Sequence, residues 1–138
     1  MVVLCLLVYQ PPTPLSMPAS LSTRTIIVGT TPLLVEVANT DAERQQGLSD
    51  RASLPQRRGM LFIFANPGNY GFWMKDMRFA IDIVWIDAAG VVVTIADNVS
   101  PDTYPQSYHS TAPAQYVLEV PAGFAKKQGI ALGTKVVI

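Results

Sequence analysis

The segment from residue 72 to residue 87 carries the side chains of this sequence that are best suited to chemistry. It holds both tryptophans of the chain and, before its last residue, four ionisable groups among bulky apolar residues: Lys75, Asp76, Arg78 and Asp82. A carboxylate within an apolar strand must be paired, hydrogen-bonded or protonated. We therefore expect Asp82 to form an ion pair or a hydrogen bond with Lys75, Arg78 or a backbone amide.

The apolar residues around Asp82 predict a strand that is buried on both faces. Side chains alternate between the two faces of a strand. Over residues 79–87, one face would carry Phe79, Ile81, Ile83 and Trp85, and the other Ala80, Asp82, Val84 and Ile86. Asp82 would be the one charged group on either face.

Two sets of residues are candidates for catalysis. Asp82 and Glu119 could act as a carboxylate pair in hydrolysis if their strands are neighbours. His109 is the one histidine, and hydroxyl groups flank it, but there is no Gly-x-Ser-x-Gly motif around a nucleophile. Structural pairing of the two carboxylates with Lys75, Arg51 or Arg78 explains the same residues more simply, so catalysis is the alternative hypothesis.

The aromatic residues favour a binding module. Trp73 and Lys75 would share one face of a strand, so that an exposed indole lies beside an ammonium group. Aromatic walls with a few polar anchors, here Lys75 and Arg78, are typical of ligand sites. Phe72 and Trp85 fit the core better. A small ligand, carbohydrate, peptide or partner protein would suit such a site, and a structural role in the cell envelope is a third hypothesis. The candidate cluster is Trp73, Lys75, Arg78, Asp82 and Glu119, with His109 as a weaker candidate.

Composition narrows the possible functions. The chain has 138 residues, 49% hydrophobic and 14% charged, which predicts one well-packed domain. Ten basic and ten acidic residues cancel, so we expect no binding to nucleic acid. One cysteine and one histidine exclude cysteine-rich zinc sites and multi-histidine metal sites. We expect neither a metal nor a cofactor.

The N-terminal 22 residues are predicted to be a tail outside the globular domain at 23–138. An apolar run at 1–9, too short to span a bilayer, precedes a segment with four prolines. This pattern resembles a secretory signal peptide without its basic start, and it predicts a periplasmic or secreted protein whose membrane contact is transient. A lipid anchor on Cys5 is disfavoured because Leu4 is larger than the small residue usual before an acylated cysteine.

The remaining pattern predicts a mainly-β domain with two short helices. Thr40 and Glu43 have the spacing of a capping box for a helix that ends at Gly47. A second helix is expected at 122–128, a turn or short helical piece at 51–55, and a long connection at 97–113. Strands are expected at 25–28, 33–38, 60–65, 70–75, 79–87, 91–96, 114–120 and 134–138. About eight short strands indicate a β-sandwich or a partly closed barrel.

Several of these segments resemble domain-of-unknown-function family 192, an uncharacterised conserved family. The resemblance covers roughly residues 33–138 and rests on Gly59-Met60-Leu61-Phe62, Phe72-Trp73-Met74-Lys75, Ile81-Asp82-Ile83 and Val117-Leu118-Glu119, among others. It implies a single mainly-β domain, often behind a signal peptide, with no settled activity. Ala80 and Thr134 depart from the family pattern, which usually has proline and an acidic residue at these two places.

The signal-like start generates a testable prediction. If the apolar run is removed on export, the native protein should lack residues 1–9, and intact-mass spectrometry should find a shorter chain in the periplasm or medium. A cytoplasmic chain that begins at Met1 would contradict it.

Overall fold

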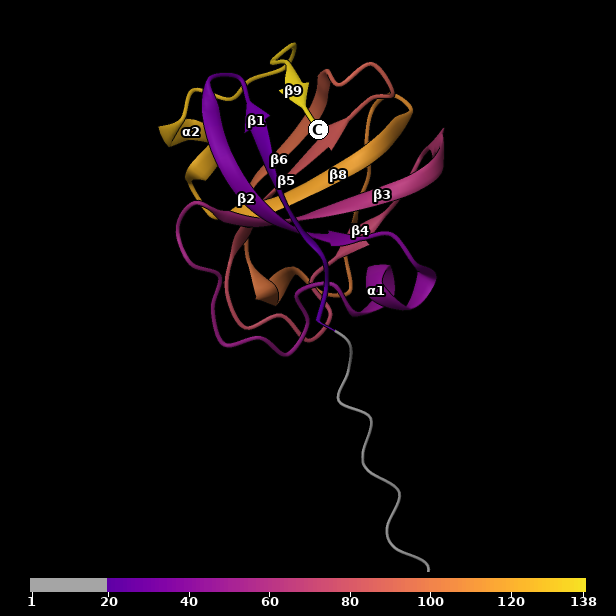
Figure 1. The fold of residues 1–138 in the computed structure, drawn as a ribbon. Helices are drawn as coiled ribbons and strands as arrows, with labels where there is room; N and C mark the ends of the chain where they lie inside the picture. The colour runs from indigo at the N-terminus through magenta and orange to yellow at the C-terminus, as the bar shows by residue number, and fades with distance from the viewer. Residues whose placement is uncertain (1–19) are drawn as a thin grey trace, which may run out of the picture.

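Seven strands curl into one sheet in the computed structural model, which describes residues 20–138 (Figure 1). The strand order is β6-β5-β8-β3-β2-β1-β9, and neighbours are antiparallel except for the parallel pair β2–β3. The seven strands are β1 (Thr23–Val28), β2 (Thr31–Ala38), β3 (Arg58–Gly68), β5 (Ile81–Ile86), β6 (Val92–Val99), β8 (Ala114–Pro121) and β9 (Val136–Val137). A separate two-stranded ribbon is formed by β4 (Phe72–Trp73) and β7 (Ser107–Tyr108).

The two edge strands of the curled sheet meet at one end. Val91 bridges Lys135, and the Val92 amide donates to the Thr134 carbonyl at 2.9 Å. The Gly133 amide donates in turn to the Val92 carbonyl at 2.8 Å. These bonds join the start of β6 to the segment before β9, so the predicted partly closed barrel is confirmed.

The central strands are buried on both faces, as the alternation around Asp82 predicts. All six residues of β5 are buried. Inside the curl, every one of the seven strands contributes to an apolar cluster that includes Val84 and Leu118. On the outer face, Ile83 and Trp85 belong to a second cluster, which is covered by residues outside the sheet such as Leu48, Phe72, Met74 and Tyr108. The outer cover is the layer in which a site can open.

Two short α-helices flank the sheet, α1 (Asp41–Gln46) and α2 (Phe124–Lys127). The capping box of α1 forms as predicted: the Thr40 hydroxyl accepts the Glu43 amide, and the Glu43 carboxylate accepts the amides of Asn39 and Thr40. The hydrogen bonds from those two backbone amides hold the pKa of the Glu43 carboxyl below its usual value. Gly47 ends α1 at a φ of 47°. Among residues 20–138, no helix is long and apolar enough to cross a membrane.

Four local predictions differ from the structure. The Asn66-Pro67-Gly68 sequence does not end β3 but lies in an irregular continuation, with a register shift between Ile63 and Gly68. The strand expected at 70–75 is reduced to β4, and the expected connection at 97–113 contains a 3₁₀ helix (Pro101–Thr103) and β7. Pairing between β4 and β7 joins segments about 35 residues apart, which no local pattern reveals. The segment 51–55 contains no helix, and the apolar run at 1–9 lies outside the described residues.

Asp82 holds three parts of the fold together through backbone amides. Its Oδ1 accepts the Asn98 amide at 2.8 Å and the Gly123 amide at 3.1 Å, and its Oδ2 accepts the Ala125 amide at 2.9 Å. Gly123 and Ala125 lie at the start of α2, and Asn98 lies near the end of β6 with a φ of 49°. Of the partners proposed for Asp82, the backbone amide is therefore the one found, and neither Lys75 nor Arg78 pairs with it.

Replacement of Asp82 should therefore destabilise the protein strongly. We expect Asp82→Ala to lower the free energy of unfolding by about 2–4 kcal/mol, because three amides lose a buried acceptor. Denaturant unfolding measures this, with Asp97→Ala, an exposed carboxylate on β6, as the control, expected to change stability by less than about 0.5 kcal/mol. Equal midpoints for wild type and Asp82→Ala would contradict the anchoring role.

Candidate ligand-binding site

A cavity of about 890 Å³ opens on the outer face of the sheet. Its lining comes from α1 and the loop after it, from β3 and β8 in the sheet, and from the segment around β4. In Figure 1, α1 and β4 lie at the same side of the curled sheet, and α2 lies at the other. The cavity therefore sits between the sheet and the layer that covers its outer core.

Glu119 provides the one carboxyl group from the sheet that lines this cavity. It pairs in register with Met60 on β3 and Ile83 on β5, so it lies on the outer face among apolar neighbours. The residue is 6% exposed, and within residues 20–138 no side chain or amide donates a hydrogen bond to its carboxyl. Every fully buried side-chain polar atom of the described residues has a partner, so the Glu119 oxygens must reach the cavity.

The environment of Glu119 favours its neutral form. Burial alone raises the pKa of this carboxyl to about 8, because desolvation penalises the charged state and nothing nearby compensates. At neutral pH the side chain can therefore donate one hydrogen bond and accept others. Such a group is equipped to contact a ligand that enters the cavity.

Aromatic rings form the wall beside Glu119. Phe72 meets Phe62 edge to face at 4.9 Å between ring centroids, and it meets Trp85 edge to face at 6.1 Å. Phe64 stacks on Tyr70 at 3.6 Å with an angle of 11° between the rings. The alternation of β3 places Phe62 and Phe64 on one face, and β4 supplies Phe72 opposite them. The wall is apolar and tied to the core.

Arg44 fixes α1 over this wall. Its guanidinium donates to the Ile63 carbonyl at 2.7 Å, pairs with Asp41 at 2.6 Å, and lies 5.1 Å from the centroid of the Phe64 ring. At the end of α1, a Cβ on Gly47 would lie 3.3 Å from the Phe62 ring, so the glycine permits close approach. The helix is thus held against the aromatic residues of β3.

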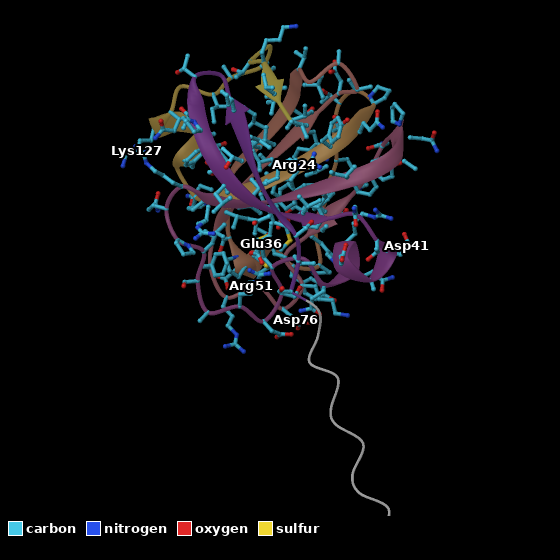
Figure 2. The ribbon with its side chains drawn as sticks, viewed as in Figure 1. Arg24, Glu36, Asp41, Arg51, Asp76 and Lys127 are labelled. Atoms are coloured by element: carbon cyan, nitrogen blue, oxygen red, sulfur yellow. The ribbon has the colours of Figure 1, made fainter. Side chains whose placement is uncertain are left out.

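The loop after α1 is joined to the segment after β4 at the rim. The Ser49 hydroxyl donates to the Lys75 carbonyl at 2.9 Å, and the Asp50 amide donates to the Asp76 carbonyl at 2.8 Å. Asp50 and Asp76 both adopt positive φ, 64° and 57°, which an aspartate tolerates better than most residues. In Figure 2, Asp41 and Asp76 both lie on the α1 side of the molecule.

Trp73 and Lys75 form the exposed part of the site. Trp73 is 51% exposed, and the Lys75 ammonium lies 5.8 Å from the centroid of the Trp73 ring. The ring of Tyr104, from the connection between β6 and β7, has its centroid 5.3 Å from that of Trp73. This is the exposed indole beside an ammonium group that the sequence predicts. An exposed indole next to a cavity offers a flat apolar contact for a ligand.

The structure brings together three of the five residues in the predicted cluster. Trp73, Lys75 and Glu119 line the cavity, whereas Arg78 and Asp82 do not. Asp82 pairs in register with Val120, and Glu119 with Ile83, so the two carboxyls lie on opposite faces of neighbouring strands. The strands are neighbours as the carboxylate-pair hypothesis requires, but the side chains cannot act on one bond.

The remaining candidates lie elsewhere. His109 is exposed and outside the cavity lining, and its ring packs against Gly71, where an added Cβ would come within 2.6 Å. Arg51 forms a two-pronged ion pair with Glu36 on β2 rather than with Asp82 or Glu119; Figure 2 labels both partners near the middle of the view. No cluster of three or more potential metal ligands occurs within residues 20–138.

Sequence reasoning missed the part of the site on β3 and α1. Phe62 and Phe64 were visible as alternate aromatics in a predicted strand, and Arg44 as a basic residue in a predicted helix. Nothing in the sequence indicated that α1 packs over β3. The helix lies in the long crossover that connects the parallel strands β2 and β3, and the path of such a crossover is not set by local sequence. Asp50, which lies in the same crossover, was missed for this reason, and Asp76 was noted among the ionisable residues of the segment 72–87 but not assigned to the site.

The comparisons with known proteins agree with this fold. The model of DUF192, described as an uncharacterized ACR, matches residues 24–138. The chain therefore belongs to this family, as the sequence resemblance implied. Among curated proteins, no sequence matches this chain.

Two solved structures are similar to the protein at 30% sequence identity. One, from Sinorhizobium meliloti 1021, is described as a "putative transcription regulator"; it has a TM-score of 0.83 and the match covers 87% of this chain and 96% of that one. The other is a protein of unknown function from Novosphingobium aromaticivorans DSM 12444, with a TM-score of 0.80 and 86% of each chain covered. The similarity extends over the whole described domain.

The buried carboxyl of Glu119 should make stability depend on pH. Between pH 4.5, the ordinary pKa, and about 8, the folded protein binds a proton that the unfolded chain does not. Stability is therefore lost as pH rises through this window, by up to about 1.4 kcal/mol per pH unit. We expect Glu119→Gln to remove this loss and to be more stable than wild type above pH 8.

Denaturant unfolding of wild type and Glu119→Gln between pH 5 and 9 measures this difference. Asp97→Asn serves as the matched control, since it removes an exposed carboxylate outside the cavity. Parallel pH curves for wild type and Glu119→Gln would show that Glu119 ionises normally.

Proposed function

We propose that this protein is a binding module whose ligand is a small organic molecule held in the cavity between α1, β3 and β4. The observation that carries the proposal is Glu119, a nearly buried carboxyl that lines the cavity and has no hydrogen-bond partner among residues 20–138. Its oxygens reach the cavity, so a ligand that hydrogen-bonds to them would compensate for the desolvation of this carboxyl.

The walls of the cavity support the same function. Ligand sites are commonly apolar and aromatic with few polar groups, and a volume of several hundred Å³ suits a small molecule. Phe62, Phe64 and Phe72 supply the apolar surface, and Trp73 extends it to the exterior. Because these residues are tied to the core or to the ribbon, the site is largely preformed.

An enzyme is the alternative, and the geometry gives it less support. The opposite faces of Asp82 and Glu119 remove the carboxylate pair, and His109 lies outside the cavity lining. Glu119 could serve as a general acid, but general acid–base chemistry needs a second group poised at the reacting bond. We therefore favour binding over catalysis.

Two further expectations remain proposals. The apolar and proline-rich tail supports export to the periplasm or medium, with membrane contact limited to that segment. A net charge of zero gives little electrostatic attraction to nucleic-acid phosphates, so we do not extend to this chain the regulatory role named for the relative from S. meliloti. A structural role in the envelope would leave the cavity without a ligand.

Screening of organic fragments by protein-observed NMR tests the binding function. Hits should shift the amide signals of Gly47, Gly71 and Trp73 at the cavity. Trp73→Ala should weaken these hits by about tenfold, roughly 1.4 kcal/mol, since aromatic anchors dominate such interfaces. Lys75→Ala should weaken them to a smaller extent.

Two control variants sharpen this test. Leu132→Ala removes an exposed apolar side chain far from the cavity and should leave binding unchanged. His109→Ala should likewise leave binding and folding almost unchanged, whereas loss of a turnover activity by about a hundredfold would favour the enzyme. Fragments that bind Trp73→Ala as tightly as they bind wild type would contradict the proposed binding function.

A further inference from the structure

The cavity combines a buried acid with aromatic rings, and this combination narrows the chemistry of the ligand. Glu119 lies on the same outer face as Phe62, one strand away, and Phe72 packs on Phe62 from the ribbon. A carboxyl group next to aromatic faces provides two complementary attractions for a cation. The first is an ion pair, and the second is the attraction of the cation to the ring quadrupole.

We propose that the ligand is an organic amine whose protonated nitrogen contacts the Glu119 carboxyl and whose apolar body packs against the aromatic lining of the cavity, chiefly the half-buried Phe72 ring. The inference rests on the proposed binding function and specifies its ligand class. Primary and secondary amines suit the site because their N–H groups can donate to both carboxyl oxygens.

The charges around the cavity support a cation. Four acidic residues and two basic residues contribute to the lining, so the balance is negative by two when all are ionised: Asp41, Asp50, Asp76 and Glu119 against Arg44 and Lys75. Arg44 is already paired with Asp41, and Lys75 lies over the exposed Trp73 ring at the rim. Asp50 and Asp76 therefore remain as acidic residues of the lining without a basic partner among residues 20–138, and Glu119 adds a third negative charge when it ionises, which favours a positive ligand over an anion.

The aromatic wall already accommodates one positive charge. The Arg44 guanidinium lies 5.1 Å from the Phe64 ring centroid, on the α1 side of the wall. Phe62 is buried and in edge-to-face contact with Phe72, so the half-buried Phe72 ring is the one that offers surface to the ligand. An ion pair between a nearly buried carboxylate and an ammonium group is stronger than the same pair in bulk water.

Amine binding should be linked to release of a proton. The carboxyl pKa of about 8 means that most Glu119 side chains are protonated at pH 7. An entering ammonium ion displaces the carboxyl proton to solvent and forms an ammonium–carboxylate pair, so charge and protons balance. The charged groups that line the cavity with Glu119 are Asp41 and Arg44 from α1, Asp50 from the following loop, and Lys75 and Asp76 after β4; β5 directs Asp82 to the other face.

Three probes with one apolar body test this ligand class: phenethylamine, 2-phenylethanol and phenylacetate. Protein-observed NMR titrations at pH 7 and pH 9 yield their affinities for wild type, Glu119→Gln and Asp97→Asn. We expect phenethylamine to bind wild type at least tenfold more tightly than the alcohol or the acid. Its affinity should rise by about tenfold from pH 7 to pH 9, as the ionised fraction of Glu119 rises from about one tenth to about nine tenths.

The variants separate the possible outcomes. Glu119→Gln should lose both the preference for the amine and the pH dependence, and Asp97→Asn should retain both. Equal binding of the alcohol or the acid at the cavity, or an amine preference that survives in Glu119→Gln, would overturn the ligand class and leave the binding function in place. If no probe shifts the cavity amides at millimolar concentration, both the ligand class and the proposed function fail.

Discussion

Burial of the central strands on both faces is the constraint on which the rest of this structure depends. The curl of the sheet covers one face, but the other face of β3, β5 and β8 needs a separate cover. A six-residue helix, a two-stranded ribbon and the loops that join them provide that cover. Short elements of this kind cannot seal a whole sheet face, and the cavity is the space that they leave.

This constraint places two carboxyl groups on adjacent strands in different hydrogen-bonding environments. Asp82 lies inside the barrel end, where three amides from β6 and α2 converge on its oxygens. Glu119 lies on the outer face, where the cover offers it no donor and burial raises its pKa to about 8. A fully satisfied buried carboxylate stabilises a fold, whereas an unsatisfied one costs stability and is more often retained for function. The contrast indicates that Asp82 has a structural role, and it is the reason that we place function at Glu119.

Membership of DUF192 places this chain in an uncharacterised family. The two similar structures share the fold over most of their length at 30% identity. A common framework of this kind does not itself define an activity, since function resides in the groups that line a site. For this protein we propose that those groups are the Glu119 carboxyl, the phenylalanine wall and the exposed pair of Trp73 and Lys75 at the rim.

The sequence by itself determined the features that depend only on residues close together in the chain. The alternation around Asp82 predicted a doubly buried strand, the Thr40–Glu43 spacing predicted a capped helix, and apolar residues flanking Trp73 and Lys75 pointed to the site. Each depends on residues within one turn or one strand, where side-chain period and capping geometry are set by the chain itself.

Only the tertiary structure decided which of these features meet. The register between β5 and β8 directs Asp82 and Glu119 to opposite faces of the sheet. A shift of this register by one residue would have placed the two carboxyls on the same face. That α1 covers Phe62 and Phe64 follows from the crossover between the parallel strands β2 and β3. Pairing of β4 with β7 joins part of the strand predicted at 70–75 to a segment that was predicted as a connection. These contacts are selected by burial of the whole outer face, a free energy summed over residues far apart in the chain, and no local pattern contains it.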